Sequence, residues 1–278
     1  MMQLGMLEAG NRHDLHVGIS PNAPDESERD NVDEAEGAFG YVHSYETASR
    51  YDGPGLRVVL FVSGCLLRCT YCHNPDTWHL KDGTHVSAQH VIGRLGDFAP
   101  ALRSLDGGLT ISGGEPLVQL NFTRRILAAA KRMGLHTAIE TSGFLGDRVD
   151  DDYLSCVDLV LLDIKSSDPE TYRRATGREL APTLRFAERL AKAGKRAWVR
   201  FTLVPGLTDD SANVAGIAKL VAPMSNVEWV EVQPFHQLGA FKWKAMNLDY
   251  LHEKTSPPSP QLMKRVIEQF RNAGCRTR

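Results

Sequence analysis

Segments rich in Val, Leu and Ile alternate with segments of helical apolar spacing from Tyr41 onward, and this alternation constrains the fold most. The predicted strands are residues 57–62, 108–112, 136–140, 159–163, 197–204 and 227–232. Strands separated by helices pair in parallel through right-handed crossovers. Because these strands are too few to close an eight-stranded barrel, the sequence predicts an α/β fold of the open, partial (β/α)6 TIM-like type.

Apolar stripes between the strands predict the helices. The stripes consist of Val91, Leu95, Phe98 and Leu102, of Phe122, Ile126, Ala130 and Met133, of Leu184, Ala187, Leu190 and Ala191, and of Val214, Ile217, Ala218 and Val221, with a last helix over residues 261–273. Ser87 and Ser211 are predicted N-caps, because a short hydroxyl side chain accepts a hydrogen bond from the first free amides of a helix. Gly134 and Gly194 are predicted to end the second and third helices.

Acidic residues dominate the stretch between Pro21 and Gly37, which has almost no large apolar side chain. They are Asp25, Glu26, Glu28, Asp30, Asp33, Glu34 and Glu36. Such a stretch cannot bury enough apolar surface to offset the entropy lost on ordering. We therefore expect residues 1–40 to form a flexible acidic tail, with partner binding as the alternative role, and residues 41–278 to form one domain.

Charge and cysteine count exclude several classes of protein. The formal net charge is -2 at pH 7, so binding to nucleic acid or to an acidic membrane through bulk charge is not expected. No apolar run approaches the roughly 20 residues that span a bilayer, and the N-terminus has no signal-peptide pattern. Three of the five cysteines share one loop, which indicates a reducing, cytoplasmic environment rather than a disulfide framework.

That loop follows the first predicted strand and carries Cys65, Cys69 and Cys72 in the spacing Cys-x3-Cys-x2-Cys. Three thiolates on one short loop bind three irons of a cubane [4Fe–4S] cluster. The fourth iron then has no cysteine ligand and stays open for chemistry. The spacing therefore predicts a cluster whose open iron serves a reaction.

The alternative is a structural zinc site in an interaction module. Zinc takes four protein ligands, usually as two separated pairs. Cys156 lies in an apolar segment and is expected in the core, whereas Cys275 is expected on the surface, so neither supplies a fourth ligand. His73 adjoins Cys72, and two adjacent ligands would strain a shared tetrahedron. The spacing favours the cluster.

With Tyr71 before the last cysteine, the loop resembles the signature of the radical S-adenosylmethionine (SAM) superfamily. The resemblance extends to the pyruvate formate-lyase activating family through the segments 52–57, 64–78, 112–115, 141–144, 162–165, 204–206, 234–239 and 242–243. It covers essentially Tyr41 to the C-terminus. Residues 74–78 lead to the next helix without added cysteines, so the chain is similar to members with a single cluster.

The resemblance implies a reaction. Members of this family hold SAM on the open iron, cleave it with one electron and remove an α-hydrogen from a glycine of a partner enzyme. The implied protein substrate is a glycyl radical enzyme like pyruvate formate-lyase, and the implied electron donor is a flavodoxin or ferredoxin, with the activator a monomer. The alternative targets are another glycyl radical enzyme, such as anaerobic ribonucleotide reductase, or a small molecule.

The resemblance also implies roles for residues that follow the predicted strands, whose carboxyl ends meet at one mouth of a barrel. The implied cofactor-binding residues are Tyr71, His73, Gly113, Gly114, Glu115, Asp163, Ile164, Lys165 and His236. Arg200 joins them as a charge inside a predicted strand, which is costly to bury unless it faces a ligand or a partner. A monovalent cation would be held by Glu140 (where the family has Asp), Thr141, Asp163 and the backbone of Leu161. Asp52 and Gly53 would meet the glycyl loop of the partner. For Arg200, and for Asp163 with Lys165, a structural ion pair is the alternative.

Overall fold

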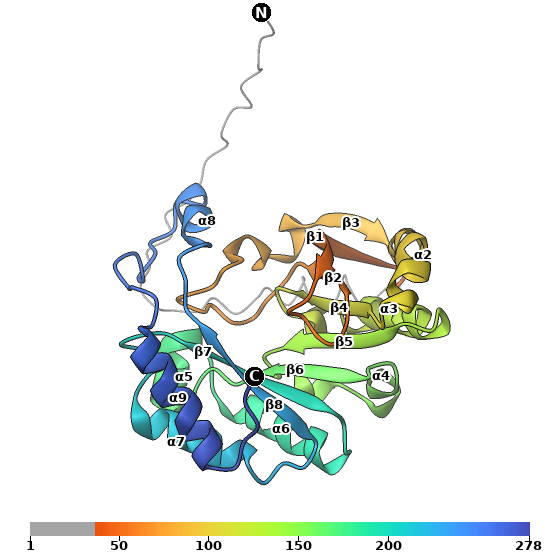
Figure 1. Cartoon of the computed structure of the whole chain (residues 1–278). Helices are drawn as coiled ribbons and strands as arrows, with labels where there is room; N and C mark the ends of the chain where they lie inside the picture. Colours follow the sequence, from red (N-terminus) through yellow and green to blue (C-terminus); the bar gives the residue numbers. More distant parts are fainter. Residues whose placement is uncertain (1–36) are drawn as a thin grey trace, which may run out of the picture.

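Parallel strands form the centre of the structure, a computed structural model that describes residues 37–278 (Figure 1). They are β2 (Arg57–Val62), β4 (Gly108–Gly113), β5 (His136–Thr141), β6 (Leu159–Asp163), β7 (Ala197–Leu203) and β8 (Val227–Pro234). The full order of the sheet is β3-β1-β2-β4-β5-β6-β7-β8. Within the described range β8 does not pair back onto the first strands, so the predicted open, partial barrel is confirmed.

Two strands were not predicted. β1 (Phe39–Ser49) pairs antiparallel with β2, and β3 (Thr84–Ser87) pairs antiparallel with β1. Only Gly40, Val42 and Ser49 of β1 are buried, so its sequence lacks the apolar run that marks the inner strands. β1 begins within the segment 1–40 that was expected to be a tail, and residues 1–36 lie outside the described residues.

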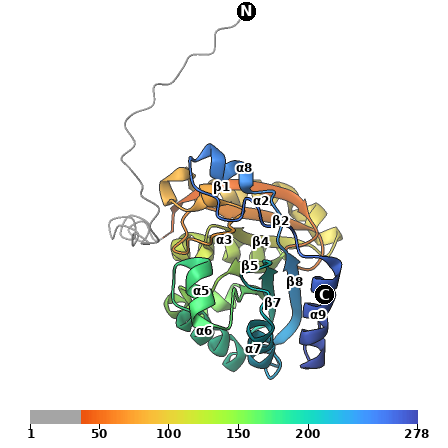
Figure 2. The ribbon, with the colours of Figure 1, turned by 90° about the vertical axis from the view of Figure 1, so that its left-hand side faces the viewer.

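The five predicted helices are present as α2 (Ala88–Ser104), α3 (Leu120–Arg132), α6 (Ala181–Lys192), α7 (Ser211–Val221) and α9 (Pro260–Asn272). Shorter helices that the sequence did not predict are α4 (Asp151–Ser155), α5 (Pro169–Thr176), α8 (Ala240–Ala245), and the 3-10 turns η1 (Pro75–Thr77), η2 (Leu80–Asp82), η3 (Pro116–Gln119) and η4 (Gly146–Arg148). None of the helices in residues 37–278 has the length and apolar composition to cross a bilayer. α8 contacts η1, and in both Figure 1 and Figure 2 it lies at the opposite end of the molecule from α7.

Most predicted helix ends are confirmed. The Ser87 side chain accepts from the amide of His90, and Gly134 and Gly194 follow their helices with positive φ angles of 74° and 59°. The prediction for Ser211 is wrong. Asp210 is the N-cap, because its carboxylate accepts from the amides of both Ala212 and Asn213, which leaves Ser211 as the first helical residue.

The strands present two different faces. The outer face, with Leu60, Ile111, Ile139, Leu162 and Val199, packs under the helices in the main core. The inner face carries a small apolar cluster of Ala138, Leu159, Leu161, Trp198 and Trp229. Further along the same strands this inner row continues as polar residues, namely Ser112, Glu140, Asp163, Arg200 and Glu231, because alternate side chains share a face. The barrel therefore has a polar interior toward its carboxyl end.

The two cysteines outside the loop differ from each other. Cys156 is half-buried and packs against the main core, as predicted. The surface position expected for Cys275 is wrong. Its residue is 8% exposed and its Sγ lies 3.8 Å from the carbonyl oxygen of Ala218. The reason is that Thr277 bridges to Val230 of β8, which draws the C-terminus against the sheet.

Arg57 is fully buried at the start of β2 and joins three strands. Its guanidinium donates to Thr110 Oγ1 at 3.0 Å, and at 3.2 Å to both the carbonyl oxygen and the ring Nδ1 of His136. Because a guanidinium only donates, this Nδ1 carries no proton. Burial, followed by the charge of Arg57, lowers the pKa of His136 to about 4.

We predict that His136 makes the fold sensitive to acid. The unfolded chain takes up this proton near pH 6.5 and the folded chain near pH 4, so stability falls as the pH drops through this interval. His136→Asn keeps an acceptor for Arg57 and should flatten the fall, as measured by urea unfolding at several pH values. The exposed His90, changed to Asn, is the control. An unaltered pH slope in His136→Asn would contradict the prediction.

Candidate active site

The cysteine loop is held in place by backbone hydrogen bonds to other elements. The amides of Gly64 and Cys65 donate to the carbonyls of Thr77 and Trp78, at 2.8 and 3.0 Å. The amides of Arg68 and Thr70 donate to the end of α5, at 2.8 and 2.9 Å. The Arg68 guanidinium also donates to the carbonyl of Cys65 at 2.5 Å. These bonds to neighbouring elements fix the conformation of the loop.

Cys65, Cys69 and Cys72 are free and partly buried on this loop. Burial is the main cause that raises the pKa of all three thiols, and that of Cys69 reaches about 12. Thiolates here need a positive group to compensate their charge, and iron supplies it. Among residues 37–278, no three His, Cys, Asp or Glu side chains converge on a single ion. A cubane does not require this, since each thiolate binds a different iron.

The turn after β4 packs directly on the cysteine loop. Gly113 has a φ of +111°, and a Cβ on Gly114 would lie 2.4 Å from the carbonyl oxygen of Gly64. Both positions therefore require glycine for packing of the chain itself. The amide of Glu115 donates to the same carbonyl at 2.8 Å, which fixes the turn against the loop.

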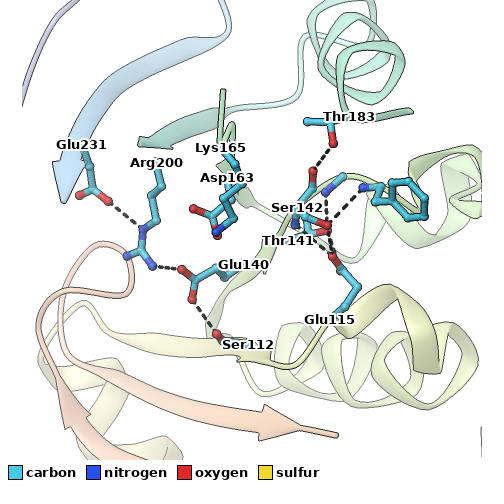
Figure 3. A network of polar contacts seen from close by, with 12 residues as sticks. Ser112, Glu115, Glu140, Thr141, Ser142, Asp163, Lys165, Thr183, Arg200 and Glu231 are labelled. Carbon is cyan, nitrogen blue, oxygen red and sulfur yellow. Dashed lines mark hydrogen bonds and ion pairs between the residues drawn. The ribbon is translucent and has the colours of Figure 1, made fainter. Parts of the chain in front are cut away.

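Glu115 is buried, and its carboxylate accepts from protein donors. Thr141 Oγ1 donates at 2.7 Å, and Ser142 donates through its Oγ at 2.6 Å and its amide at 3.0 Å. The amide of Leu117 donates at 3.2 Å. Burial raises the pKa of Glu115 despite these bonds. The carboxylate therefore ties the turn after β4 to the end of β5 (Figure 3).

Arg200 lies at the centre of a buried ionic network (Figure 3). Its side chain is 3% exposed and pairs with Glu140, with Glu231 at 3.0 Å and with Asp52 at 3.3 Å. It also donates to the carbonyl of Tyr51 at 2.6 Å. Arg200 thus forms the ion pairs that were the alternative interpretation of this residue.

Glu140 is held by two donors. Arg200 binds one carboxylate oxygen, and Ser112 Oγ donates to the other at 2.6 Å. Burial acts to raise the pKa of Glu140, but the charge of Arg200 and the bond from Ser112 outweigh it, so the pKa is lowered. Glu140 is therefore ionised, and each of its carboxylate oxygens already accepts a hydrogen bond from the protein.

Asp163 and Lys165 form an ion pair of 3.0 Å at the end of β6. Their side chains are 14% and 13% exposed, so the pair is not a surface one. Although burial opposes the charge, Asp163 holds the pKa of Lys165 above its usual value. The second carboxylate oxygen of Asp163, Oδ1, is buried without a hydrogen-bond partner in the described structure. A buried unpaired oxygen is costly and fits a ligand group.

His73 and His236 stack, with ring centroids 4.0 Å apart and planes 17° apart. His73 Nε2 donates to the carbonyl of His236 at 3.1 Å. Burial, followed by the charge of His236, lowers the pKa of His73 to about 4. The pair joins the cysteine loop to the segment after β8. The neighbouring Tyr71 is buried, and its hydroxyl is also without a partner in the described structure.

The other predicted site residues do not share one environment. The Ile164 side chain is fully buried in the main core, so only its backbone can face the site. The Leu161 side chain is part of the inner apolar cluster. Asp52 accepts from Ser49 Oγ at 2.5 Å besides pairing with Arg200, and Gly53 follows it with a φ of +126°.

Three polar residues of the site were missed from the sequence. Glu231 pairs with Arg200, Ser112 donates to Glu140, and Ser142 donates to Glu115. The sequence signal for Glu231 was available, since it interrupts the apolar residues of a predicted strand and a buried charge needs a partner. Nothing in the sequence marks which acceptor Ser112 and Ser142 bind.

The chain matches the radical SAM superfamily model over residues 59–215. It is 37% identical to the pyruvate formate-lyase 1-activating enzyme of Escherichia coli (strain K12) over 237 residues, 84% of this chain and 96% of that protein. It is 38% identical to the pyruvate formate-lyase-activating enzyme of Staphylococcus epidermidis over 232 residues, 81% of this chain and 92% of that one.

Solved structures show the same fold. Streptococcus suis SuiB bound to precursor peptide SuiA has a TM-score of 0.61 at 13% identity, covering 79% of this chain and 48% of that one. A domain of the Bacteroides vulgatus pyruvate-formate lyase-activating enzyme has a TM-score of 0.53 at 24% identity, covering 62% and 98%. Fold, cysteine loop and sequence match together place the chain in the radical SAM superfamily. Within it, the chain belongs to the family of pyruvate formate-lyase activating enzymes.

We predict that Arg200→Met destabilises the protein by about 3–5 kcal/mol, because it leaves buried carboxylates unpaired. The pKa of Glu140 should then rise, so the deficit should shrink as the pH falls and the carboxylate takes up a proton. Arg196→Met is the matched control. It removes an arginine that is 55% exposed and pairs with Glu228, so it should cost at most about 1 kcal/mol. The measurement is the free energy of unfolding in urea. Equal decreases in the two variants would contradict the stabilising role assigned to the Arg200 network.

Proposed function

We propose that this chain installs a glycyl radical on a glycyl radical enzyme of the pyruvate formate-lyase type, using a [4Fe–4S] cluster and SAM. The proposal rests on one arrangement of side chains around the cysteine loop. Cys65, Cys69 and Cys72 lie on a loop that is ordered by hydrogen bonds to neighbouring elements, and the structure also leaves two buried oxygens without a partner in the described residues, Asp163 Oδ1 and Tyr71 Oη. The donor set fits three irons of a cubane and a polar ligand next to it.

When bound, the cluster and SAM supply the one-electron chemistry that ends in removal of a glycine α-hydrogen. The residues of the chain bind and orient these groups. The free oxygen of Asp163 and the ammonium of Lys165 would hold polar groups of SAM, and the turn at Gly113 and Gly114 would offer backbone groups. His236, whose ring stacks on that of His73, would contact the nucleoside of SAM.

Asp52 and Gly53 would face the glycyl loop of the protein substrate. The support is that Asp52 is placed by Arg200 and by Ser49, so its loop is preorganised rather than free. Relatives named for pyruvate formate-lyase favour this substrate over anaerobic ribonucleotide reductase. Zinc as the bound metal has no support in the family match.

A monovalent cation beside SAM belongs to the same proposal. Of its implied ligands, Glu140 is bound by Arg200 and Ser112, and Thr141 Oγ1 donates to Glu115. Asp163 Oδ1 and the carbonyl of Leu161 are therefore the main ligands proposed. Replacing K⁺ by tetramethylammonium should weaken SAM binding to the reduced protein several-fold. Equal SAM affinity in both buffers would remove the cation from the proposal.

The electron donor would be a flavodoxin or ferredoxin, and the enzyme would act as a monomer in the cytoplasm, where thiols stay reduced. Residues 41–278 would form the catalytic domain. The acidic segment before it is proposed to be dispensable for SAM cleavage.

The central prediction is that the anaerobically reconstituted chain, with reductant, SAM and a pyruvate formate-lyase partner, produces the glycyl radical doublet in electron paramagnetic resonance spectra. Cys69→Ala should lower both the doublet and the yield of 5′-deoxyadenosine to background, because a cubane loses one anchor. Cys156→Ala, which removes a thiol that packs on the main core, should retain most of both. Normal yields in Cys69→Ala, or no doublet from the wild type, would refute the proposal.

A further inference from the structure

Residues 236–252, which include α8 and are here called the α8 segment, lie against the second half of the cysteine loop. At one end of the segment, the ring of His236 stacks on that of His73 with centroids 4.0 Å apart. At the other end, His252 Nε2 lies 3.0 Å from Thr70 Oγ1. The segment is therefore fixed against the loop on both sides of its last cysteine.

The backbone of the α8 segment is in direct contact with the loop. A Cβ on Gly239 would lie 2.7 Å from the Cα of His73, so the approach requires glycine. The side-chain nitrogen of Gln237 donates to the carbonyl oxygens of His252 and Glu253, at 2.8 and 3.0 Å. These bonds hold the two ends of the segment together, with α8 between them.

Trp243 of α8 bonds the backbone of a predicted cluster ligand. Its indole Nε1 donates to the carbonyl oxygen of Cys72 at 2.8 Å. Trp243 is 6% exposed, and its ring meets Trp78 edge to face with centroids 5.1 Å apart and Tyr250 at 5.2 Å. Because these ring contacts fix the direction of the N–H group, the indole holds the Cys72 carbonyl in one place.

Lys242, the preceding residue of α8, bonds the chain just after Cys72. Its ammonium donates to Asn74 Oδ1 at 2.8 Å and pairs with Asp76 at 2.9 Å. Asp76 is also 3.0 Å from the ring nitrogen Nε2 of His43 in β1. The Lys242 side chain is 20% exposed, so these contacts are partly shielded from water.

The first part of the loop is attached in a different way. The backbone amides of Cys65 and Thr70 donate to the end of η1 and the end of α5, at 3.0 and 2.9 Å. The amide of Cys72 donates to the carbonyl of Cys69 at 3.0 Å, which is a bond within the loop itself. The attachment of Cys72 to the neighbouring elements therefore relies on side chains of α8.

We propose that Lys242 and Trp243 are positioning residues that hold Cys72 as the third ligand of the cluster and thereby slow the loss of iron. The inference rests on the proposed function, since it requires the cluster. A broken iron–thiolate bond forms again while the sulfur stays beside the metal, whereas a displaced sulfur leaves that iron to a competing ligand. Removing groups that orient a metal ligand weakens metal binding by roughly 10-fold to 100-fold.

The test is the rate at which the anaerobically reconstituted full chain, without SAM or partner, loses iron to excess EDTA, followed by the visible absorption of the cluster. Trp243→Phe keeps an aromatic ring but removes the N–H group, so it should raise this rate roughly tenfold. Lys242→Met should also raise the rate. Lys242→Arg keeps a cationic donor and should restore most of the wild-type behaviour.

Two matched variants are the controls. Lys244→Met removes an exposed lysine of the same helix. Trp198→Phe removes an indole N–H that donates to Glu228 at 2.9 Å in the sheet. Both should lose iron at the wild-type rate. In urea, the unfolding free energies of iron-free Trp243→Phe and Trp198→Phe should decrease by similar amounts, because each variant loses one hydrogen bond.

A wild-type rate of iron loss in Trp243→Phe or in Lys242→Met would overturn the proposal for that residue. An equal acceleration in Trp198→Phe or Lys244→Met would overturn it for both, because the effect would then not be specific to Cys72. So would a decrease in the stability of iron-free Trp243→Phe large enough to account for its faster loss of iron. Should Trp243→Phe not fold, equal rates in Lys242→Met and Lys242→Arg are the overturning result. A wild type that assembles no cluster refutes the proposed function instead, so the two failures are distinguishable.

Discussion

The buried guanidinium of Arg200 is the interaction on which the interior of this barrel depends. It joins β7 to β5 through Glu140, to β8 through Glu231, and to the β1–β2 loop through Asp52. The sheet is open, so hydrogen bonds between its two ends do not hold the first strands against the last. One cation with several carboxylates contributes to that task, and it requires a complete set of partners because an unpaired buried charge is costly.

The fold was predictable because its signal is local and repeated. The inner strands are rich in Val, Leu and Ile, and each long helix has a stripe at helical spacing, so strand and helix positions follow from the sequence. β1 was missed because it has few buried residues and carries polar residues among its apolar ones. The N-cap at Ser211 was wrong because Asp210, one residue earlier, offers a stronger acceptor to the same amides. Cys275 was wrong because a terminal bridge to β8 is not visible in sequence.

The sequence predicted which polar side chains gather at the strand ends, but not how they pair with one another. The cysteines, Asp163 and Lys165 were singled out from motifs at strand ends, and Arg200 as a charge inside a predicted strand, where it is indeed buried and paired. Which carboxylate each cation binds depends on the curvature of the sheet and on rotamers, and neither is encoded in spacing. Glu115 illustrates the difference, because a motif residue expected at SAM has its carboxylate engaged by Thr141, Ser142 and Leu117.

The order of the cysteine loop has a consequence for cluster binding. Its amides are already paired with Thr77, Trp78 and the end of α5, so little backbone entropy is lost when iron binds. The remaining cost is electrostatic, because burial raises the pKa of all three thiols and each must lose a proton. The indole of Trp78 acts against burial to lower the pKa of Cys72, which reduces that cost at one of the three thiols.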